Sequence, residues 1–378
     1  MAIPAASEWA SFDDTVGIPL DISDVLSAIL LVDDQLLSKV PSGAAVPDVT
    51  HRWVEDQLQA NSVTAAEGSE ITAGDLTLSV TTGQGARVRI GALLRDKASG
   101  KEEILQVTAI STDDLTVTRG YGTTTGETHA ATAEFEIVAQ PKQEGADTQN
   151  SKNSNTKTER NNLAMIFERG IFVTGTYEAR KYVVPKDHLK YEINKMLLEL
   201  RREMSTAVYN SIKSAAGSDS ILRTFEGIRE ALRFTASTNL VTTSESLTPG
   251  VLEDLLQQCW DDGGSPNLIA TRANLFRRIG EFYSDRIRYA PSDRVRGQFV
   301  NKFQSSLGYE LDLLANHWVN EGDLVALDMT RVKLQPFRPM KVEAMARTGD
   351  AMKWQMLGEY VLEVRNRLES HALHTNLT

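Results

Sequence analysis

A polar segment near the middle of the chain limits most strongly what this sequence can fold into. From Asp147 to Asn162, sixteen consecutive residues include no apolar side chain. Such a segment cannot bury apolar surface of its own, so we expect a loop, or an arm that becomes ordered only against another molecule. The stretch that follows, "LAMIFERGIFVTGT", alternates like a strand pair or an extended ribbon. No catalytic motif nearby explains the polar segment, so its role has to be sought in the rest of the chain.

A long helical pattern comes next, from about residue 185 to residue 216. Pro185 suits a first helical turn, and Gly217 follows the last periodic position. About thirty residues at ~1.5 Å each make a rod of roughly 45 Å, which is too long for the core of a small domain. We expect it to span a flat or elongated one. The apolar residues recur at three- and four-residue steps on one face and are Leu189, Ile193, Met196, Leu200, Met204, Val208 and Ile212.

Residues 62–140 are rich in Thr, Val and Gly and predict a different kind of structure. Five short alternating runs, bounded by turn residues, indicate a small β-barrel or sandwich of roughly eighty residues. The glycine-rich "TRGYGTTTGETHAA" lacks the Gly-Lys-Ser/Thr of a phosphate-binding loop, and we expect His129 within it to be a turn histidine. The five runs are "DLTLSVTT", "ARVRIGALLRD", "KEEILQVTAI", "DLTVTRGYG" and "AEFEIVA".

The two ends of the chain complete an α+β pattern. Residues 1–60 predict an arm with one helix in "DISDVLSAILLVDDQLLSKV" and with Trp53 as a packing anchor. Further along, "GVLEDLLQQCWDDGG" predicts a helix that stops at the paired glycines. The remaining patterns are a strand and a helix capped at Thr271, a hairpin turning at Leu307-Gly308, and strands with a turn at Thr348-Gly349-Asp350 before a closing amphipathic strand or helix.

The sequence carries no recognisable catalytic or ligand-binding motif. It has no GxSxG, no HExxH, no Walker lysine, no zinc-finger spacing and no dinucleotide fingerprint. The six histidines are scattered, and we expect His371 and His374 to be tail residues. The single cysteine, Cys259, cannot form an internal disulfide and is expected to be a partly buried structural thiol. We therefore predict no catalytic residue, no cofactor and no metal ligand, and we do not expect an enzyme.

No part of the sequence indicates a membrane protein. The longest apolar passages, such as "VLSAILLV", are far shorter than the ~20 residues that a membrane-spanning helix needs. The N-terminus lacks the basic and apolar regions of a signal peptide. We expect a protein that is made and kept in a reducing cytoplasm and that has no membrane partner.

The charge of the chain is acidic overall but uneven. Forty basic and fifty-one acidic residues give a net charge of −11, so we do not expect the whole surface to wrap nucleic acid, although the protein could enclose DNA without gripping it. Between Arg277 and Lys302, seven basic residues face only three acidic ones. This asymmetry suits subunits of one protein that attract each other at different patches. A solvated face with local ion pairs is an equally open interpretation.

Five passages resemble the SU-ten-like major head proteins of tailed phages, a family with the Hong Kong 97-type capsid fold. No single passage is specific, but five in this order are, and the similarity covers nearly the whole chain. The order of arm, loop, long helix, α/β region and returning strands is similar to that fold as well. The passages are "HRWVEDQL" (51–58), "LTVTRGYGTTTGETHA" (115–130), "KTERNNLAMIFERGIFVTGT" (157–176), "CWDDGGSPNLIATRANLFRRIGEF" (259–282) and "ARTGDAMKWQMLGEYVLEVRN" (346–366).

The resemblance implies a division of the chain into six segments. In this fold a long loop leaves the subunit and lies over a neighbour, which would account for the polar segment. The β-rich residues would then be an insertion between the arm and the loop. The implied segments are an N-terminal arm (1–61), an inserted small β domain (62–141), the extended loop (142–184), the spine helix of the peripheral domain (185–221), the axial domain (222–325) and the return strands of the peripheral domain (326–378).

The resemblance also implies partners and contacts. Copies of the chain would form hexamers and pentamers of an icosahedral or prolate shell around dsDNA, with a scaffolding protein, a portal and a decoration protein as further candidates. The shell would be assembled in the host bacterial cytoplasm and become part of the virion. The inter-subunit contacts that we expect are Arg160, Phe167 and Arg169 on the loop and Arg286, Arg288, Arg294 and Arg296 in the axial domain.

Two other functions stay open at this point. A tail or baseplate component with a β binding module would form rings or trimers and would carry aromatic-rich strands, yet residues 62–140 hold only Tyr121 and Phe135 as aromatic residues. A cytoplasmic enzyme with an accessory β domain would need convergent polar groups, and the sequence nominates none.

Overall fold

The structure is a computed structural model that describes residues 35–66, 68, 70–148, 157–180, 188–214, 222–233, 239–282, 302–347 and 349–378. The chain divides into two compact units, residues 1–53 with 161–378, and residues 54–160. Each unit has an apolar core of its own. Helices and strands are both present, which confirms the α+β class expected from the sequence.

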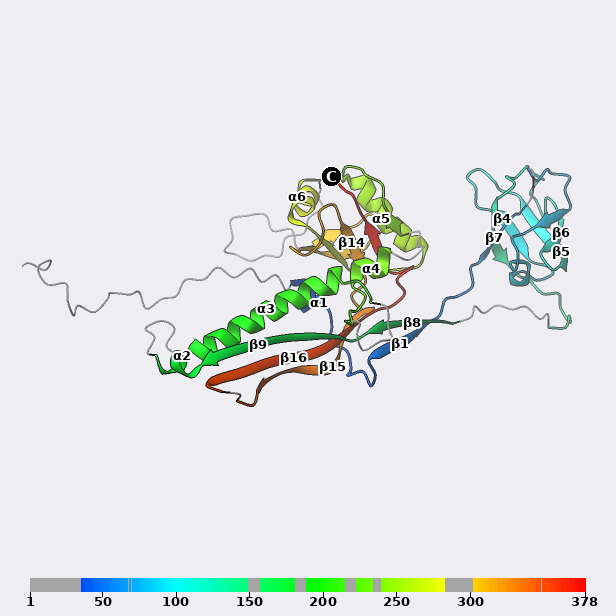
Figure 1. The fold of residues 1–378 in the computed structure, drawn as a ribbon. Helices are drawn as coiled ribbons and strands as arrows, with labels where there is room; N and C mark the ends of the chain where they lie inside the picture. Colours follow the sequence, from blue (N-terminus) through cyan, green and yellow to red (C-terminus); the bar gives the residue numbers. More distant parts are fainter. Residues whose placement is uncertain are drawn as a thin grey trace, which may run out of the picture. The chain divides into compact units, whose positions relative to one another are not determined.

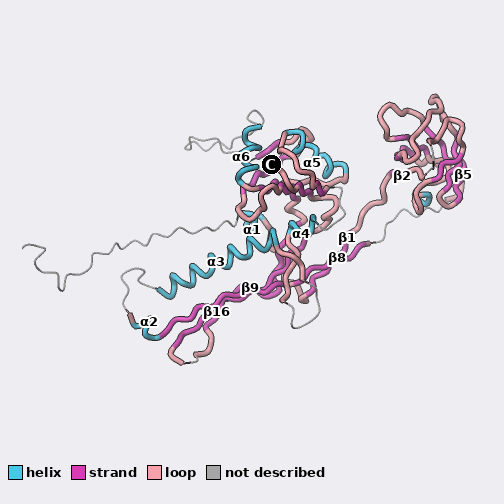
Figure 2. The backbone as a smooth tube through the Cα atoms, turned by 45° about the horizontal axis from the view of Figure 1, so that its top comes forward, coloured by secondary structure: helices cyan, strands magenta, loops and turns pink. Residues whose placement is uncertain are grey.

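The longest helix, α3 (His188–Asn210), lies along a three-stranded antiparallel sheet in the first unit (Figures 1 and 2). The sheet has the order β15–β16–β9, with β15 (Val332–Ala344), β16 (Ala351–Val364) and β9 (Met165–Thr174). The apolar stripe predicted for the helix packs here, because Met196, Leu200, Met204 and Val208 are all buried in the core that includes strand residues of this sheet. The shorter helices α1 (Gln35–Lys39), α2 (Gly175–Ala179) and α4 (Ile228–Arg233) complete this part of the chain.

The helix α3 is shorter than the periodic pattern between residues 185 and 216. It ends at Asn210, whose side-chain amide donates a hydrogen bond to the Trp318 carbonyl oxygen (2.6 Å). Ile212, which continues the apolar spacing, is 63% exposed beyond the helix end. Gly217, the expected stop, lies outside the described residues. The apolar periodicity of the sequence therefore extends beyond the last residues of α3 that pack in the core.

A second sheet, of six strands, forms the other part of the first unit. Helices α5 (Pro249–Asp261) and α6 (Ala273–Phe282) pack on it and bury Leu256 and Ile279 beside Ile269. The predicted hairpin is confirmed, because β12 and β13 are antiparallel and Gly308 takes a positive φ of 90° between them. The order is β10 (Leu240–Val241), β17 (Ala372–His374), β14 (Leu324–Leu327), β11 (Leu268–Thr271), β13 (Glu310–Ala315) and β12 (Lys302–Gln304).

Of two local expectations in this unit, one needs correction and the other, left open between a strand and a helix, is decided. Thr271 does not cap α6: it is the last residue of β11, and its hydroxyl donates to the Asp323 carbonyl oxygen (3.2 Å). The closing amphipathic segment is the strand β16 and not a helix, since it pairs along its length with β15 and β9.

The second unit is a closed β-barrel. Backbone bonds from Ala66 N–H to Ser79 O (2.8 Å) and from Thr81 N–H to Thr64 O (2.9 Å) join its first and last strands. Its interior is filled by apolar side chains such as Leu94, which is fully buried. In strand order it contains β2 (Ser62–Thr64), β7 (Glu134–Ala139), β4 (Leu93–Asp96), β5 (Ile104–Ser111), β6 (Asp114–Thr118) and β3 (Thr77–Ser79), with a 3₁₀ turn at Gly85–Arg87.

Two paired strands lead the chain into the second unit and back. β1 (Thr50–Glu55) and β8 (Thr158–Leu163) form a two-stranded sheet. Ala164 N–H donates to Val49 O (2.8 Å), and counting along both strands from this bond places Glu55 opposite Thr158. The β domain therefore lies between two paired strands, of which β1 belongs to the expected arm and β8 to the expected extended loop. Residues 165–174 of the expected extended loop form β9 in the sheet under α3; the six segment boundaries themselves stay predictions.

Candidate inter-subunit surfaces

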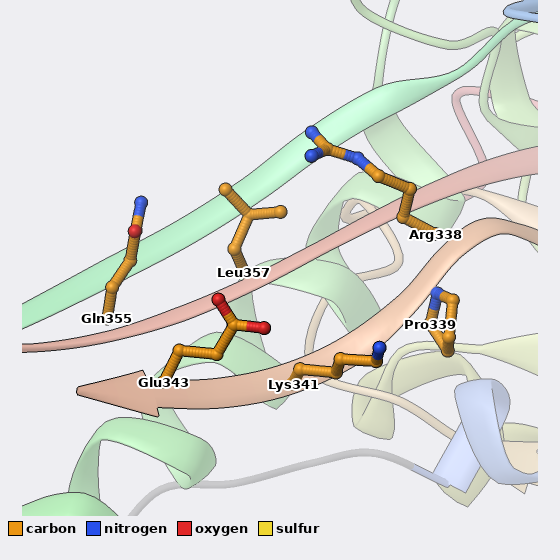
Figure 3. A pocket seen from close by; sticks show the side chains of 6 residues that line it. All are labelled: Arg338, Pro339, Lys341, Glu343, Gln355 and Leu357. Atoms are coloured by element: carbon orange, nitrogen blue, oxygen red, sulfur yellow. The ribbon is translucent and has the colours of Figure 1, made fainter. Parts of the chain in front are cut away.

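One face of the β15–β16–β9 sheet is covered by the chain itself near Pro336 and Val361, which we call its inner end. The same face is exposed near Glu343 and Phe172, which we call its outer or open end. The strand register places Lys341, Leu357 and Glu168 in one row and Glu343, Gln355 and Gly170 in the next. These rows face away from α3, because the intervening Arg169 points to the helix and pairs with Glu203 (3.0 Å). A hollow of about 300 Å³ lies on the β15 and β16 part of these rows (Figure 3). Its lining consists of Arg338, Pro339, Lys341, Glu343, Gln355 and Leu357.

The open end combines apolar and charged side chains. Phe172 is 66% exposed, with its ring beside Gly170 and with the Lys353 ammonium 5.6 Å from the ring centroid. Ile166, on the same face, is 42% exposed. The Gln355 amide donates to Glu168 (2.5 Å). An exposed aromatic ring surrounded by polar and charged side chains is typical of a contact surface.

The inner end of the same face is covered by the chain's own extended segment before β1. Val46 packs on Val361 with Ala164, and Val46 N–H donates to Pro336 O (3.0 Å) along the edge of β15. Farther along, His51 Nε2 lies 2.9 Å from the carboxylate of Glu363, which is fully buried. The open end is thus the continuation of a face that already accepts an extended segment.

A groove lies beside α3 on the other side of the same sheet. It has a volume of about 450 Å³ and lies between the helix, β9 and the Trp318 loop. Its lining contains Arg169 and Arg202 together with Glu199 and Glu203, and Arg169 pairs with Glu203, so its charges are balanced. Such a groove favours no class of charged ligand.

The expected contact residues have different surroundings. Arg160 lies 3.6 Å from Glu55, and Arg169 pairs with Glu203, so both already have partners in their own chain. Phe167 needs correction: only 1% of it is exposed, because its ring packs with Phe225 and Tyr360 in the core under α3. The exposed ring on this strand is Phe172, which lies on the opposite face of β9. The remaining expected contacts, Arg286, Arg288, Arg294 and Arg296, lie outside the described residues.

The histidines expected in a tail and in a turn are buried. His371 is fully buried, with Asp328 N–H donating to Nδ1 (3.2 Å) and Nε2 donating to the Arg365 carbonyl oxygen (3.1 Å). Burial lowers the pKa of His371 to about 4. His374 is also buried, with Nε2 2.8 Å from Glu245. These side chains sit in or beside β17, a strand that is paired on both sides in the sheet, which explains why they are not free tail residues.

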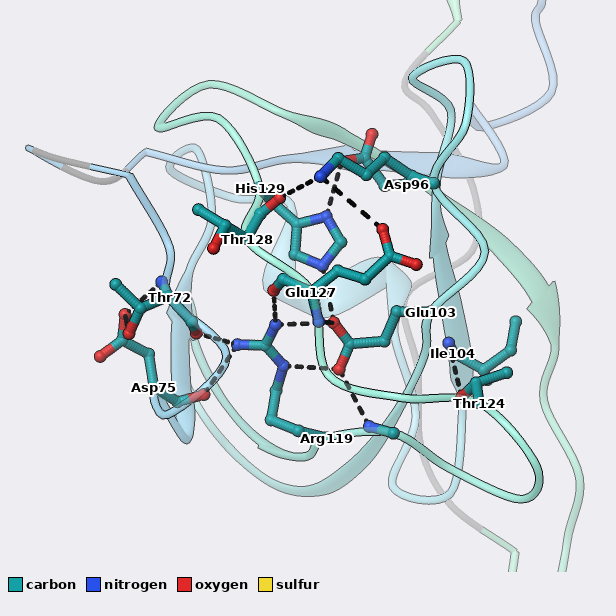
Figure 4. A network of polar contacts seen from close by, with 12 residues as sticks. Thr72, Asp75, Asp96, Glu103, Ile104, Arg119, Thr124, Glu127, Thr128 and His129 are labelled. Atoms are coloured by element: carbon teal, nitrogen blue, oxygen red, sulfur yellow. Dashed lines mark hydrogen bonds and ion pairs between the residues drawn. The ribbon is translucent and has the colours of Figure 1, made fainter.

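His129 belongs to a buried polar network at one end of the barrel (Figure 4). Its Nδ1 lies 2.7 Å from Asp96 and its Nε2 lies 2.9 Å from Glu103. Glu103 also accepts two hydrogen bonds from Arg119 (2.7 and 2.8 Å) and one each from the N–H groups of Gly120 (2.9 Å) and Glu127 (2.7 Å). Burial acts to raise the pKa of Glu103, but these hydrogen bonds outweigh it and lower the pKa to about 2.

Neither a metal centre nor a membrane helix is found where the chain is described. Among those residues, no three His, Cys, Asp or Glu side chains are grouped so that they could hold a metal ion. No described helix is long and apolar enough to span a bilayer. Cys259 is free and buried, and burial raises the pKa of its thiol to about 12.

A family model described as "SU10 major capsid protein" matches residues 9–378. The chain belongs to the SU10 major capsid protein family. The resemblance seen in the five sequence passages is thereby confirmed. Among curated protein sequences no relative matches this chain.

Solved capsid structures share the fold of the chain. The capsid asymmetric unit of Cyanophage A-1(L) matches with a TM-score of 0.58 at 10% identity, over 96% of this chain and 97% of that one. The capsid of an empty GTA particle matches with a TM-score of 0.54 at 8% identity, over 98% of each chain. At such identities the likeness establishes the fold, which is the Hong Kong 97-type capsid fold.

Family and fold together define the role of the chain. It is a structural major capsid protein of a tailed phage, as expected from its sequence. Its copies assemble with one another into a shell, and its place is the virion. The tail-component and enzyme alternatives are not supported by the family that matches.

Proposed function

We propose that copies of this chain associate as hexamers and pentamers into a closed icosahedral or prolate head shell around packaged dsDNA. The match to the major capsid family over residues 9–378 is the observation that carries this proposal. Assembly would take place in the host bacterial cytoplasm before the genome is packaged. The role is mechanical, and we assign no catalytic step to any residue, in keeping with a structural family.

The charge of the chain supports enclosure of DNA without tight binding. A net charge of −11 opposes a DNA-wrapping surface, because tight binding to phosphates depends on clustered Lys and Arg that release counterions. A shell that repels its content at short range leaves the packaged DNA free to be ejected. The proposal therefore predicts weak, salt-sensitive binding of the unassembled chain to DNA.

We propose the open end of the β15–β16–β9 face as a contact with a neighbouring copy. Three features support a second copy as the occupant: the family self-assembles, the face continues one that accepts an extended segment, and Phe172 is exposed beside mixed charges. Arg160 on β8 and Arg169 on the α3 side of the sheet stay proposed contacts elsewhere, which require that a neighbour supplies a carboxylate in place of Glu55 and Glu203. Arg286, Arg288, Arg294 and Arg296 stay proposed contacts of the axial domain.

The particles made by the chain test the proposed function directly. The chain should be produced in bacteria together with its genomic neighbours, and the particles examined by negative-stain electron microscopy. Closed isometric or prolate shells are expected. Rings or tubes that never close would move the chain to a tail role. Leaving out the scaffolding protein, the portal or the decoration protein one at a time tests each of these further proposed partners.

A matched pair of substitutions tests the proposed contact. Phe172→Asp places a charge on the open face, and Leu76→Asp does the same at a similarly exposed apolar residue (60%) of the barrel. Only Phe172→Asp is expected to reduce the yield of shells, because a buried unpaired carboxylate at an interface is costly. Both chains should stay soluble and folded. Equal yields from the two variants would remove the open face from the contact.

A further inference from the structure

The barrel has the features of a unit that folds without help from the rest of the chain. Its strands close on themselves through the Ala66–Ser79 and Thr81–Thr64 backbone bonds, so no strand edge depends on an outside partner. Its core consists of side chains from residues 63–137 alone. All described apolar contacts that fill its interior are therefore supplied locally.

A second, polar core closes one end of the barrel. Glu103 is fully buried and holds Arg119 and His129, while Asp96 holds the other side of the His129 ring (Figure 4). Arg119 also donates to the carbonyl oxygens of Thr72 and Glu127, which ties the glycine-rich loop 119–131 to the loop before β3. Every partner in this network belongs to residues 72–129. The loop is thus fixed by the barrel itself.

The connection to the first unit has the geometry of a hairpin tip. Because β1 and β8 pair and Glu55 stands opposite Thr158, the chain ends on either side of residues 56–157 are neighbours across two strands. A two-residue turn such as Asn-Gly joins strand ends in this arrangement. The whole of residues 56–157 therefore occupies the place of a turn.

We infer that residues 56–157 are a separable module inserted at the tip of the β1–β8 hairpin. The remaining residues, 1–55 and 158–378, fold without it and form the shell without it. The module then serves a task other than closing the shell. The assembly part of this inference rests on the proposed function, whereas the folding part stands independently of it.

The first experiment replaces residues 56–157 by Asn-Gly and compares this variant with the full chain. All five tryptophans lie outside the deleted residues, at positions 9, 53, 260, 318 and 354, so tryptophan fluorescence reports the first unit in both proteins. We expect the same fluorescence maximum, hydrogen exchange of α3 and β16 within about twofold of the full chain, and closed shells from both.

The outcomes separate the inference from the proposed function. If the full chain makes shells and the deleted chain is folded but makes none, the assembly part of the inference is wrong. A deleted chain that does not fold overturns the inference entirely. If neither protein makes shells, the proposed function is wrong, and the exchange of α3 and β16 still decides whether the module is separable.

A point variant of the full chain gives a second readout without any deletion. Glu103→Gln removes the charge that holds Arg119 and His129, and we expect hydrogen exchange in residues 71–75 and 119–131 to rise about tenfold or more. Glu134→Gln is the control, because Glu134 forms its ion pair on the barrel surface, with about half of its side chain exposed. Exchange in α3 and β16 should not change in either variant. A matching rise there for Glu103→Gln would show that the two units do not fold separately.

Discussion

The buried His371 makes a sharp prediction about the stability of the first unit in acid. Its ring is neutral in the folded chain, since Nδ1 accepts from Asp328 N–H and Nε2 donates to the Arg365 carbonyl oxygen. Adding a proton would leave a buried cation and remove the acceptor for Asp328 N–H. Burial, aided by the nearby Arg331 charge, accordingly lowers the pKa from 6.5 to about 4.

The sign and size of the effect follow from this pKa. In the unfolded chain the imidazole takes up its proton near pH 6.5, whereas in the folded chain it does so only near pH 4. The contribution of His371 to the free energy of unfolding is therefore fully present above pH 6.5. It is lost as the pH is lowered to 4, and below pH 4 this residue causes no further loss. At ~1.4 kcal/mol per pH unit, the loss amounts to about 3 kcal/mol.

Urea unfolding of the unassembled chain between pH 7 and pH 4 measures this loss. Tryptophan fluorescence follows the first unit alone, because none of the tryptophans lies in residues 54–160. His371→Gln is the matched control, since a glutamine amide can accept from Asp328 N–H and donate to the Arg365 carbonyl oxygen but does not titrate. The wild-type chain should lose about 3 kcal/mol more than the variant over this range. Identical pH profiles for the two proteins would refute the reasoning.

Three further predictions concern single buried groups. Asn162→Ala should destabilise the first unit by about 2–4 kcal/mol, because the Asn162 amide bonds the backbone of Glu226 and Leu362; urea unfolding checks this, with the exposed Asn161→Ala as control. Cys259 should react with a thiol reagent only after unfolding, since burial raises its pKa to about 12; fast labelling of the folded chain would contradict this. The barrel should keep its stability above pH 4.5 and lose it progressively as the pH falls toward 2, where Glu103 is protonated; hydrogen exchange of residues 119–131 measures this, and a flat profile would argue against it.

Local patterns in the sequence were sufficient to predict much of the fold. The α3 stripe, the strands β3 to β7 and the hairpin at Gly308 all have periodicities or turn residues within a few positions of each other. β2 was missed because its three residues, Ser62–Thr64, are too few to show alternation. The sequence left a barrel and a sandwich both open for the same reason, since closure depends on backbone bonds of that short strand.

Distant pairings explain the rest of the differences. Gln355 meets Glu168 although 187 residues separate them, so the open face could not be assembled from either segment alone. His129 looked like a turn residue because its partners, Asp96 and Glu103, lie 33 and 26 residues away. Phe167 and Phe172 have similar local surroundings in the sequence, and only the position of α3 decides that the first is buried and the second exposed.

The closed barrel has a consequence for a protein whose copies are held close together. In a shell, each copy of the module is kept at a very high local concentration beside others of identical sequence. An open sheet edge under these conditions would pair with the edge of the next copy and start aggregation. The bonds that join β2 to β3 remove that edge, so crowding does not lead to strand exchange between modules. Such a barrel can be carried in many copies by one particle and still act as many single domains.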